Sequence, residues 1–252
     1  MITLKGLIIR EAQKGESNKL IHVLTAERGV ISVYVRGGMK STKNAAATQL
    51  YVYSKFCLEK TVDPKGPIFY YLNSSEPEEM FYELRLDVVK MSLAAYLADL
   101  IYYARIEGVS DMTEVLRLTL NTFYFLNRGQ KDPEFLKSVF EFRLLCDIGF
   151  RPDLLCCPKC YKYLSDKMYL NMAEGYIECE DCCTDKDGMY VYELDRSLLH
   201  VIRHIALTDL ERLFAVKISA KLQLKLTNLT EGYIRYHFRE SFDTLKFYRS
   251  IT

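Results

Sequence analysis

The sequence predicts an α+β multidomain protein, with an N-terminal OB-fold β-barrel over residues 1–76 and an all-α domain over residues 77–252. The second domain is expected to carry an inserted four-cysteine zinc knuckle at residues 151–189. Three observations predict this organisation. The N-terminal part holds five short β-prone runs and no long amphipathic helix. Apolar residues then recur every three or four positions, and two cysteine pairs interrupt the helical part.

The N-terminal strands are recognised by β-branched and aromatic residues and by the glycine-rich and polar turns between them. Val30–Arg36 is the clearest strand, because Ile31, Val33 and Val35 alternate with more polar positions. The five expected strands cover residues 7–9, 19–24, 30–36, 50–58 and 68–72. Short strands without an intervening long helix fit a small closed barrel, and the OB-fold is the commonest barrel of this size that binds nucleic acids.

From Leu86 onward the hydrophobic period becomes that of a helix. One face of a long helix is marked by Leu86, Val89, Leu93, Leu97, Leu100 and Ala104. Further helices are expected at about 112–127, 134–147, 195–206 and 209–216. A last amphipathic helix is marked by Leu222, Leu226, Leu229, Tyr233 and Tyr236. We expect the helices on the two sides of the cysteine segment to pack together, which makes that segment an insertion.

Four cysteines form two pairs, each with a two-residue gap: Cys157, Cys160, Cys179 and Cys182. The 18 residues between the pairs are the spacing of a zinc ribbon, in which two tight turns close one tetrahedral site. Four sulfur ligands leave no open position, so structural zinc is expected and metal catalysis is not. Cys156 and Cys183 offer alternative pairings, and iron is a possible occupant of the same thiolate cage.

The charge of the 252-residue chain is unevenly distributed, although its net charge is only +1. Residues 1–75 carry 11 Lys and Arg against 5 Asp and Glu, whereas residues 76–150 carry 8 against 13. The basic N-terminal part favours contact with a polyanion, and the alternative is a merely solvated charged face. The sequence shows neither a long apolar run nor a secretory leader, so we expect a cytoplasmic protein with reduced cysteines.

Six cations of the first domain are the candidate DNA-binding residues: Arg10, Lys14, Lys19, Arg36, Lys40 and Lys43. They could follow a phosphate backbone along a groove and a loop. Tyr34, Tyr51 and Tyr53 could offer faces for base stacking, although each could instead pack in the core or at its rim. The last three cations are favoured, because the Gly37-Gly38 step predicts a mobile and exposed loop.

The sequence carries no enzymatic signature and no candidate catalytic residue. It has no phosphate-binding glycine loop, no dinucleotide fingerprint and no nucleophile elbow. His200 and His204 are four residues apart, but no Glu follows His200, so a structural role is favoured. The acidic residues of 76–87 are expected at a helix start, where the helix dipole favours them, and not in a two-metal nuclease site.

Several motifs, in order, resemble the RecO family of bacterial DNA repair and recombination mediators. They are Gly15–Leu20, Thr25–Ser32, Arg36–Lys40, Phe140–Leu145 and Gly149–Leu154, followed by the four cysteines. These motifs span nearly the whole chain, so the resemblance is specific. The family often has consecutive arginines where this chain has Met39-Lys40, which implies a weaker contact of this loop with DNA.

The resemblance implies an OB-fold domain, a helical domain and a zinc knuckle. It also implies binding of single-stranded and double-stranded DNA, annealing of complementary strands, and a place in the RecF pathway. The implied partners are RecR, the C-terminal tail of single-stranded DNA-binding protein and, indirectly, RecA. It places the basic loop on Arg36 and Lys40 and the first two metal ligands on Cys157 and Cys160.

Some family members lack the cysteines, so the metal is not expected to be needed for DNA contact. The alternative function is that of an interaction adaptor, which docks repair proteins without binding DNA through its basic loop.

Overall fold

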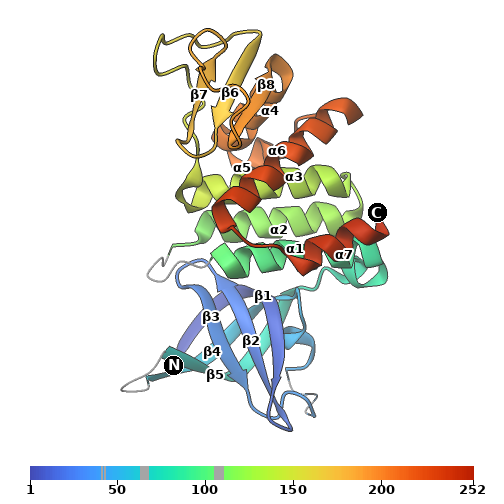
Figure 1. Ribbon diagram of the computed structural model, residues 1–252. Helices are drawn as coiled ribbons and strands as arrows, with labels where there is room; N and C mark the ends of the chain where they lie inside the picture. Colours follow the sequence, from blue (N-terminus) through green and yellow to red (C-terminus); the bar gives the residue numbers. More distant parts are fainter. Residues whose placement is uncertain (41, 43, 63–67, 105–110) are drawn as a thin grey trace. The chain divides into compact units, whose positions relative to one another are not determined.

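The computed structural model describes residues 1–40, 42, 44–62, 68–104 and 111–252. They form two compact units (Figure 1). The first unit comprises Met1–Gln130 together with Phe242–Thr252, and the second comprises Lys131–Ser241. The domain boundary expected after residue 76 stays a prediction. Among the described residues, none of the helices is long and apolar enough to cross a membrane.

Five strands form a closed barrel in the first unit. They are β1 (Ile2–Lys14), β2 (Asn18–Thr25), β3 (Gly29–Val35), β4 (Tyr53–Val62) and β5 (Ile68–Glu79). Around the barrel the order is β1-β2-β3-β5-β4. Neighbouring strands are antiparallel except β3 and β5, which are parallel. This is the predicted OB-fold.

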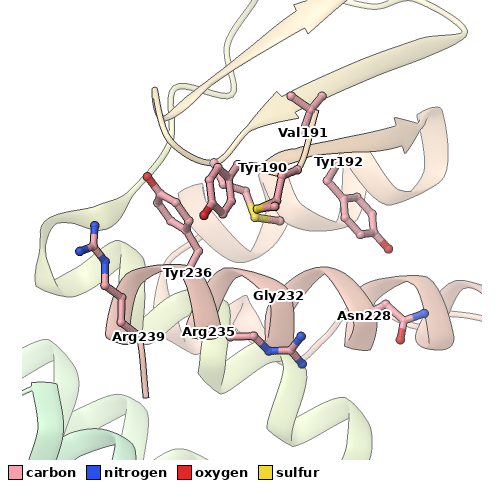
Figure 2. Close-up of a pocket in the computed structure, with 10 residues that line it drawn as sticks. Tyr190, Val191, Tyr192, Asn228, Gly232, Arg235, Tyr236 and Arg239 are labelled. Carbon is pink, nitrogen blue, oxygen red and sulfur yellow. The ribbon is translucent and has the colours of Figure 1, made fainter. Parts of the chain in front are cut away.

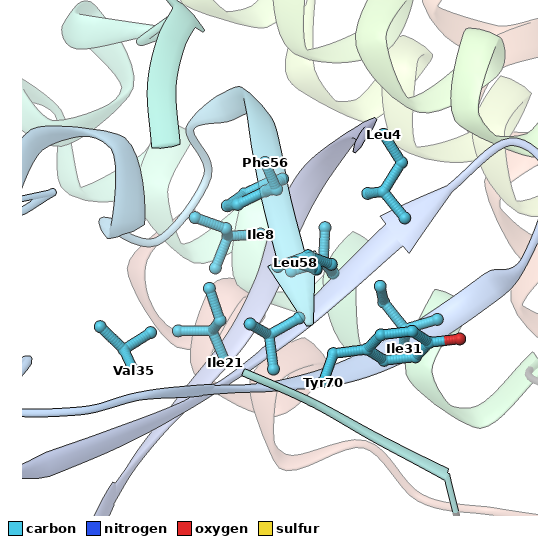
Figure 3. Close-up of a cluster of buried hydrophobic side chains, with 10 residues drawn as sticks. Leu4, Ile8, Ile21, Ile31, Val35, Phe56, Leu58 and Tyr70 are labelled. Carbon is cyan, nitrogen blue, oxygen red and sulfur yellow. The ribbon is translucent and has the colours of Figure 1, made fainter. Parts of the chain in front are cut away.

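The barrel encloses one apolar core (Figure 3). Its largest buried contributions come from Leu4, Ile8, Ile21, Val33, Phe56, Leu58 and Tyr70. The alternation predicted for β3 is confirmed, because Ile31, Val33 and Val35 are buried and the residues between them are only partly buried. Gly6 is required where β1 approaches β2, since a Cβ at this position would lie 2.5 Å from the Val23 side chain.

The acidic residues that follow the barrel are a correction to the sequence analysis. Glu76, Glu78 and Glu79 lie at the end of strand β5 and not at a helix start. Pairing with β4 extends β5, and Lys5 of the neighbouring β1 forms an ion pair with Glu78 at 2.7 Å. Glu83 lies in the first turn of a short 3-10 helix, η2 (Tyr82–Leu86), and Asp87 has the expected role, because its Oδ1 accepts hydrogen bonds from the backbone at the start of the following helix.

Three helices complete the first unit: α1 (Val88–Ala104), α2 (Thr113–Arg128) and α7 (Asp243–Ile251). The long helix predicted from the apolar period is confirmed by α1. Helix α7 was not predicted. It packs on α1, where Thr244 donates a hydrogen bond to Asp99 at 2.9 Å and Phe242 meets the ring of Tyr96 edge-on. The break before α7 is made by Arg239 in the left-handed conformation, with φ +52°, where no glycine or proline marks it in the sequence.

The second unit combines helices with a small antiparallel sheet. The helices are α3 (Pro133–Leu145), α4 (Arg196–Leu207), α5 (Leu210–Leu213) and α6 (Ala220–Phe238), and a π-helical turn, η3 (Cys146–Phe150), follows α3. The sheet has the order β7-β6-β8, with β6 (Lys167–Asn171), β7 (Tyr176–Cys179) and β8 (Val191–Asp195). Helices from both sides of the cysteine segment pack together, as α3 contacts α4 and α6.

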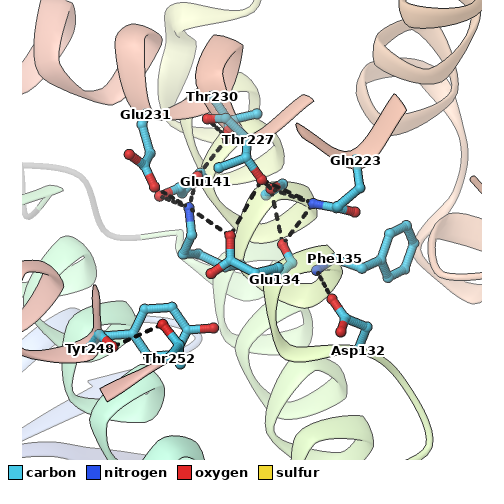
Figure 4. A network of polar contacts seen from close by, with 12 residues as sticks. Asp132, Glu134, Phe135, Glu141, Gln223, Thr227, Thr230, Glu231, Tyr248 and Thr252 are labelled. Atoms are coloured by element: carbon cyan, nitrogen blue, oxygen red, sulfur yellow. Dashed lines mark hydrogen bonds and ion pairs between the residues drawn. The ribbon is translucent and has the colours of Figure 1, made fainter. Parts of the chain in front are cut away.

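A buried ionic network joins α3 to α6 (Figure 4). The ammonium of Lys137 lies 3.2 Å from Glu141 and 2.7 Å from Glu231, and the side chains of Lys137 and Glu141 are both fully buried. Thr230 of α6 donates a hydrogen bond to Glu141 at 2.6 Å. A buried charge is tolerated only when it is paired and hydrogen-bonded, so these contacts fix one register of α3 on α6.

Replacing Lys137 by Ala should lower the free energy of unfolding of the second unit by about 3–5 kcal/mol, because Glu141 would remain buried without its cation. Urea denaturation of the full chain measures this loss. The double variant Lys137→Met/Glu141→Met removes both buried charges and should recover most of the stability. The exposed control Lys221→Ala should change stability by less than about 0.5 kcal/mol. Equal losses for Lys137→Ala and Lys221→Ala would contradict this role of the network.

Candidate metal centre and nucleic-acid interface

The structure brings together the four cysteines that the spacing singled out. The sulfur atoms of Cys157, Cys160, Cys179 and Cys182 all lie within 4.8 Å of one another. Cys156 and Cys183 are outside this cluster among the described residues. Four Zn–S bonds of about 2.3 Å in a tetrahedron need sulfur atoms about 3.8 Å apart. The cluster therefore fits a metal ion with little adjustment.

Two tight turns present these sulfurs. In the first turn, the amide of Tyr161 donates to the carbonyl of Cys157 at 2.8 Å. In the second, the amides of Cys182 and Cys183 both donate to the carbonyl of Cys179. Strand pairing sets the position of the second turn, because Cys179 ends β7 opposite Met168 of β6. The sequence pattern of a two-residue gap thus corresponds to a hydrogen-bonded knuckle in each case.

The electrostatics of the cluster favour a cation. Burial opposes ionisation of the Cys157 thiol, but hydrogen bonds from the backbone at Cys179, Cys160 and Lys159 lower its pKa to about 6. The pKa of Cys182 is raised to about 12, mainly by its hydrogen bond with Cys160. Without a counter-charge, the cluster therefore favours a thiolate at Cys157 and a protonated thiol at Cys182. A bound cation allows all four groups to ionise together, with release of protons.

Lysines of the first knuckle also reach the second. The ammonium of Lys159 lies 2.6 Å from Glu178 and donates to the carbonyl of Cys182 at 3.0 Å. Lys162 forms an ion pair with Asp181 at 2.6 Å. Lys162 and Asp181 are both exposed, so their pair contributes little stability by itself, whereas Glu178 is buried beside its exposed partner Lys159. The main effect of the two pairs is to hold the two turns in register.

Arg203 of α4 holds the first knuckle against the helices, and sequence reasoning missed this role. Its guanidinium donates to the carbonyls of Leu154, Leu155 and Tyr163, at 2.7, 3.0 and 2.8 Å. It also stacks on the Tyr163 ring, with 4.0 Å to the centroid. One side chain thus satisfies three backbone acceptors of the metal loop. The expected structural role of the neighbouring His204 agrees with its hydrogen bond to the carbonyl of Leu213.

Three of the candidate DNA-binding cations come together at one end of the barrel. Lys14 is paired with Asn18 across β1 and β2, and the Asn18 side chain accepts a hydrogen bond from the amide of Gly37. Arg36 directly precedes Gly37, and Lys40 follows it three residues later. The side chains of Lys14, Arg36 and Lys40 are all exposed. We call Lys14, Arg36 and Lys40 the basic end. Arg36 to Lys40 form a turn in which the amide of Lys40 donates to the carbonyl of Gly37 at 3.0 Å, and the mobility predicted for this loop stays a prediction.

Aromatic side chains border the basic end. The guanidinium of Arg36 lies over the Tyr71 ring, 4.5 Å from its centroid. The rings of Tyr71 and Tyr34 are stacked, with 5.5 Å between centroids and an interplanar angle of 29°. Phe69 meets Tyr34 edge-on. A cation and partly exposed rings therefore lie side by side on the outer face of β3 and β5.

The remaining candidate cations do not join this group. Arg10 is exposed and lies over the ring of Tyr102, 4.6 Å from its centroid. Lys19 is only 13% exposed, and its ammonium is held by Glu11 at 2.5 Å and by the carbonyl of Thr48 at 2.8 Å. Lys43 lies outside the described residues.

The tyrosine candidates also differ from one another. Tyr51 is 3% exposed and packs edge-on against Phe123, so of the two possibilities left open by the sequence it has the core position and offers no stacking face. Tyr34 and Tyr53 are both partly exposed, and of these two only Tyr34 stacks on another described ring.

Comparisons with known proteins agree with this fold. Residues 1–77 match the family description "Recombination protein O N terminal", and residues 85–246 match "Recombination protein O C terminal". The chain is 29% identical over 252 residues to the DNA repair protein RecO of Caldicellulosiruptor bescii, covering 100% of this chain and 99% of the relative. It is 27% identical over 248 residues to the RecO of Acetivibrio thermocellus, covering 98% and 95%. One set of relatives thus matches the chain over nearly its whole length, from the barrel through the helical part that contains the four-cysteine cluster. The chain therefore belongs to the RecO family of DNA repair proteins.

Proposed function

We propose that the chain is a non-enzymatic mediator of DNA recombination and repair. It binds single-stranded and double-stranded DNA with little sequence preference and anneals complementary strands. The observation that carries this proposal is the arrangement of Arg36 over Tyr71 beside Tyr34, at the basic end of the barrel. The name of the related RecO proteins, which describes DNA repair, supports it.

The proposed contact combines charge with stacking. Lys14, Arg36 and Lys40 neutralise successive phosphates, which releases counterions and makes binding depend on salt. Bases stack on the outer aromatic rings without readout of their edges, so every sequence binds. Annealing follows because neutralised strands repel one another less, and their bases stay free to pair.

We further propose that the four-cysteine cluster holds zinc, with iron as a possible substitute in the same cage. Cys157, Cys160, Cys179 and Cys182 would occupy all four positions, so the metal takes no part in a reaction. It holds the two knuckles together and couples the fold of this segment to metal binding.

The partners proposed for this chain are those of the family. RecR and the C-terminal tail of single-stranded DNA-binding protein would dock on it, and the complex would help to load RecA on coated strands in the cytoplasm. The adaptor function, without DNA binding through the barrel, is the competing proposal. It predicts that the basic end has no effect on DNA affinity.

Replacing Arg36 and Lys40 together by Ala should weaken binding of a single-stranded oligonucleotide and lower the salt slope of its binding constant by about 1.4, for two lost phosphate contacts. Fluorescence anisotropy at several salt concentrations gives both quantities. The matched control is Arg28→Ala/Lys55→Ala, which removes the same charge from exposed positions of the same barrel. Unchanged affinity and slope in the Arg36/Lys40 variant would favour the adaptor.

Replacing Cys160 by Ser should abolish stoichiometric metal and lower the melting temperature of the second unit, because metal binding and folding are coupled there. Elemental mass spectrometry of the purified chain should find one zinc per wild-type molecule. Cys156→Ser is the control, since Cys156 lies outside the sulfur cluster, and it should retain the metal. The proposal fails if both variants lose the metal to the same extent, or if the wild type holds none.

A further inference from the structure

The second unit contains a pocket that none of the proposed activities uses (Figure 2). Its volume is about 840 Å³, within the usual range for ligand sites. One wall is the chain leading into β8, and the other is a face of α6. The residues that matter for its chemistry are Met172, Tyr190, Gly232, Arg235, Tyr236 and Arg239.

Local hydrogen bonds shape the wall beside β8. The amide of Met172 donates to the carbonyl of Tyr190 at 2.8 Å, which fixes the corner from which the Tyr190 side chain extends. Tyr192 donates to the carbonyl of Lys225 at 3.2 Å and so ties β8 to α6. Both walls are therefore held in place before any ligand binds.

Gly232 keeps the floor of the pocket open. It lies within α6, where glycine is less favourable for a helix than alanine. A Cβ at this position would lie 3.7 Å from Cε of Met172, which is an ordinary contact. Internal packing therefore does not demand glycine here. Its effect is to leave space above the Met172 side chain.

Two arginines line the pocket at the end of α6: Arg235 lies in the last turn of the helix, and Arg239 is the left-handed residue that ends it. Arg235 and Arg239 are both exposed. Across the part of the chain that the structure describes, neither guanidinium has an ion pair or a side-chain hydrogen bond. The pair therefore suits a ligand with negative charges along its length, which would reach the two guanidinium groups in turn.

Two aromatic rings lie beside these cations. Tyr190 and Tyr236 have ring centroids 4.8 Å apart and planes inclined by 60°. Tyr190 is 47% exposed, so much of its ring is accessible. The pocket thus offers flat apolar surface, an apolar floor and a row of two cations within one cavity.

We propose that this pocket is a second contact for single-stranded nucleic acid, separate from the basic end of the barrel. One base stacks on Tyr190 or Tyr236 above the Met172 floor, and the neighbouring phosphates bind Arg235 and Arg239. A short acidic peptide is the rival ligand. The observations favour the nucleic acid, because two cations without an ion pair among the described residues line the same pocket as an accessible aromatic surface.

A contact in each unit gives the chain a way to hold two strands at once. One strand would lie on the barrel and the other in this pocket, so that pairing becomes an event within one complex. A second site for a DNA strand is useful only if the chain binds DNA, so this inference rests on the function proposed above.

Photo-cross-linking tests the pocket in the full chain. The probe is a single-stranded oligonucleotide that carries 5-iododeoxyuridine at several positions, and mass spectrometry identifies the cross-linked peptides. We expect cross-links at Tyr190 or Tyr236 in addition to cross-links in the barrel. The Arg36→Ala/Lys40→Ala variant should lose barrel cross-links and keep those in the pocket.

Variants of the pocket should lose the cross-links in the pocket and keep those in the barrel. Arg235→Ala/Arg239→Ala should reduce the pocket cross-links at least about tenfold and leave the barrel cross-links unchanged. Gly232→Leu, which fills the floor, should remove the pocket cross-links while the arginines remain. The control Lys217→Ala/Lys221→Ala removes the same charge from exposed residues of the second unit outside the pocket and should change nothing.

The outcomes separate the two proposals. Cross-links in the barrel alone would overturn the second site and leave the proposed function intact. No cross-links in either unit would overturn both. A labelled peptide of alternating aspartate and phenylalanine tests the rival ligand. If Gly232→Leu weakens binding of this peptide, and the oligonucleotide leaves no cross-link in the pocket, the site is a peptide site and the proposal is overturned.

Discussion

The pairing of β3 with β5 is the contact on which the barrel and its proposed DNA surface both depend. It is the one parallel pairing in the described barrel, and it aligns Val33 with Tyr70 and Tyr34 with Tyr71. Since side chains alternate along a strand, the first pair is buried in the core and the second lies outside. Closure of the core and stacking of the outer rings therefore follow from the same register. A slip by one residue would exchange the two sets.

The second unit joins the sulfur cluster, the sheet and the helices into one support. The sulfur cluster fixes the end of β7, and β6 carries that constraint across the sheet to β8. The corner that leads into β8 then presents Tyr190 to α6. Arg203 secures the first knuckle from the helical side. The four-cysteine cluster thus supports the segment that forms one wall of the pocket.

Local patterns predicted much of this structure. The alternation of β3 and the gaps between cysteines act over a few residues, so the strand and the two knuckles were recognised without knowledge of the fold. Features set by distant partners were not. Lys19 looked like a free cation, but Glu11 and Thr48 hold its ammonium. For Tyr51 the sequence left a stacking face or a core position open, and the fold buries its ring against Phe123 of α2. Helix α7 has only 9 residues, which is shorter than the window over which a helical period is recognised, and the pocket joins segments far apart in the sequence.

Hydrogen–deuterium exchange with and without a single-stranded oligonucleotide tests the central claim most directly. We predict that the bound strand slows amide exchange at residues 29–40 and 68–79, where the basic end and the outer rings of the barrel lie. Saturating binding with no change of exchange in these segments would contradict the proposal that the closed barrel is the main DNA contact.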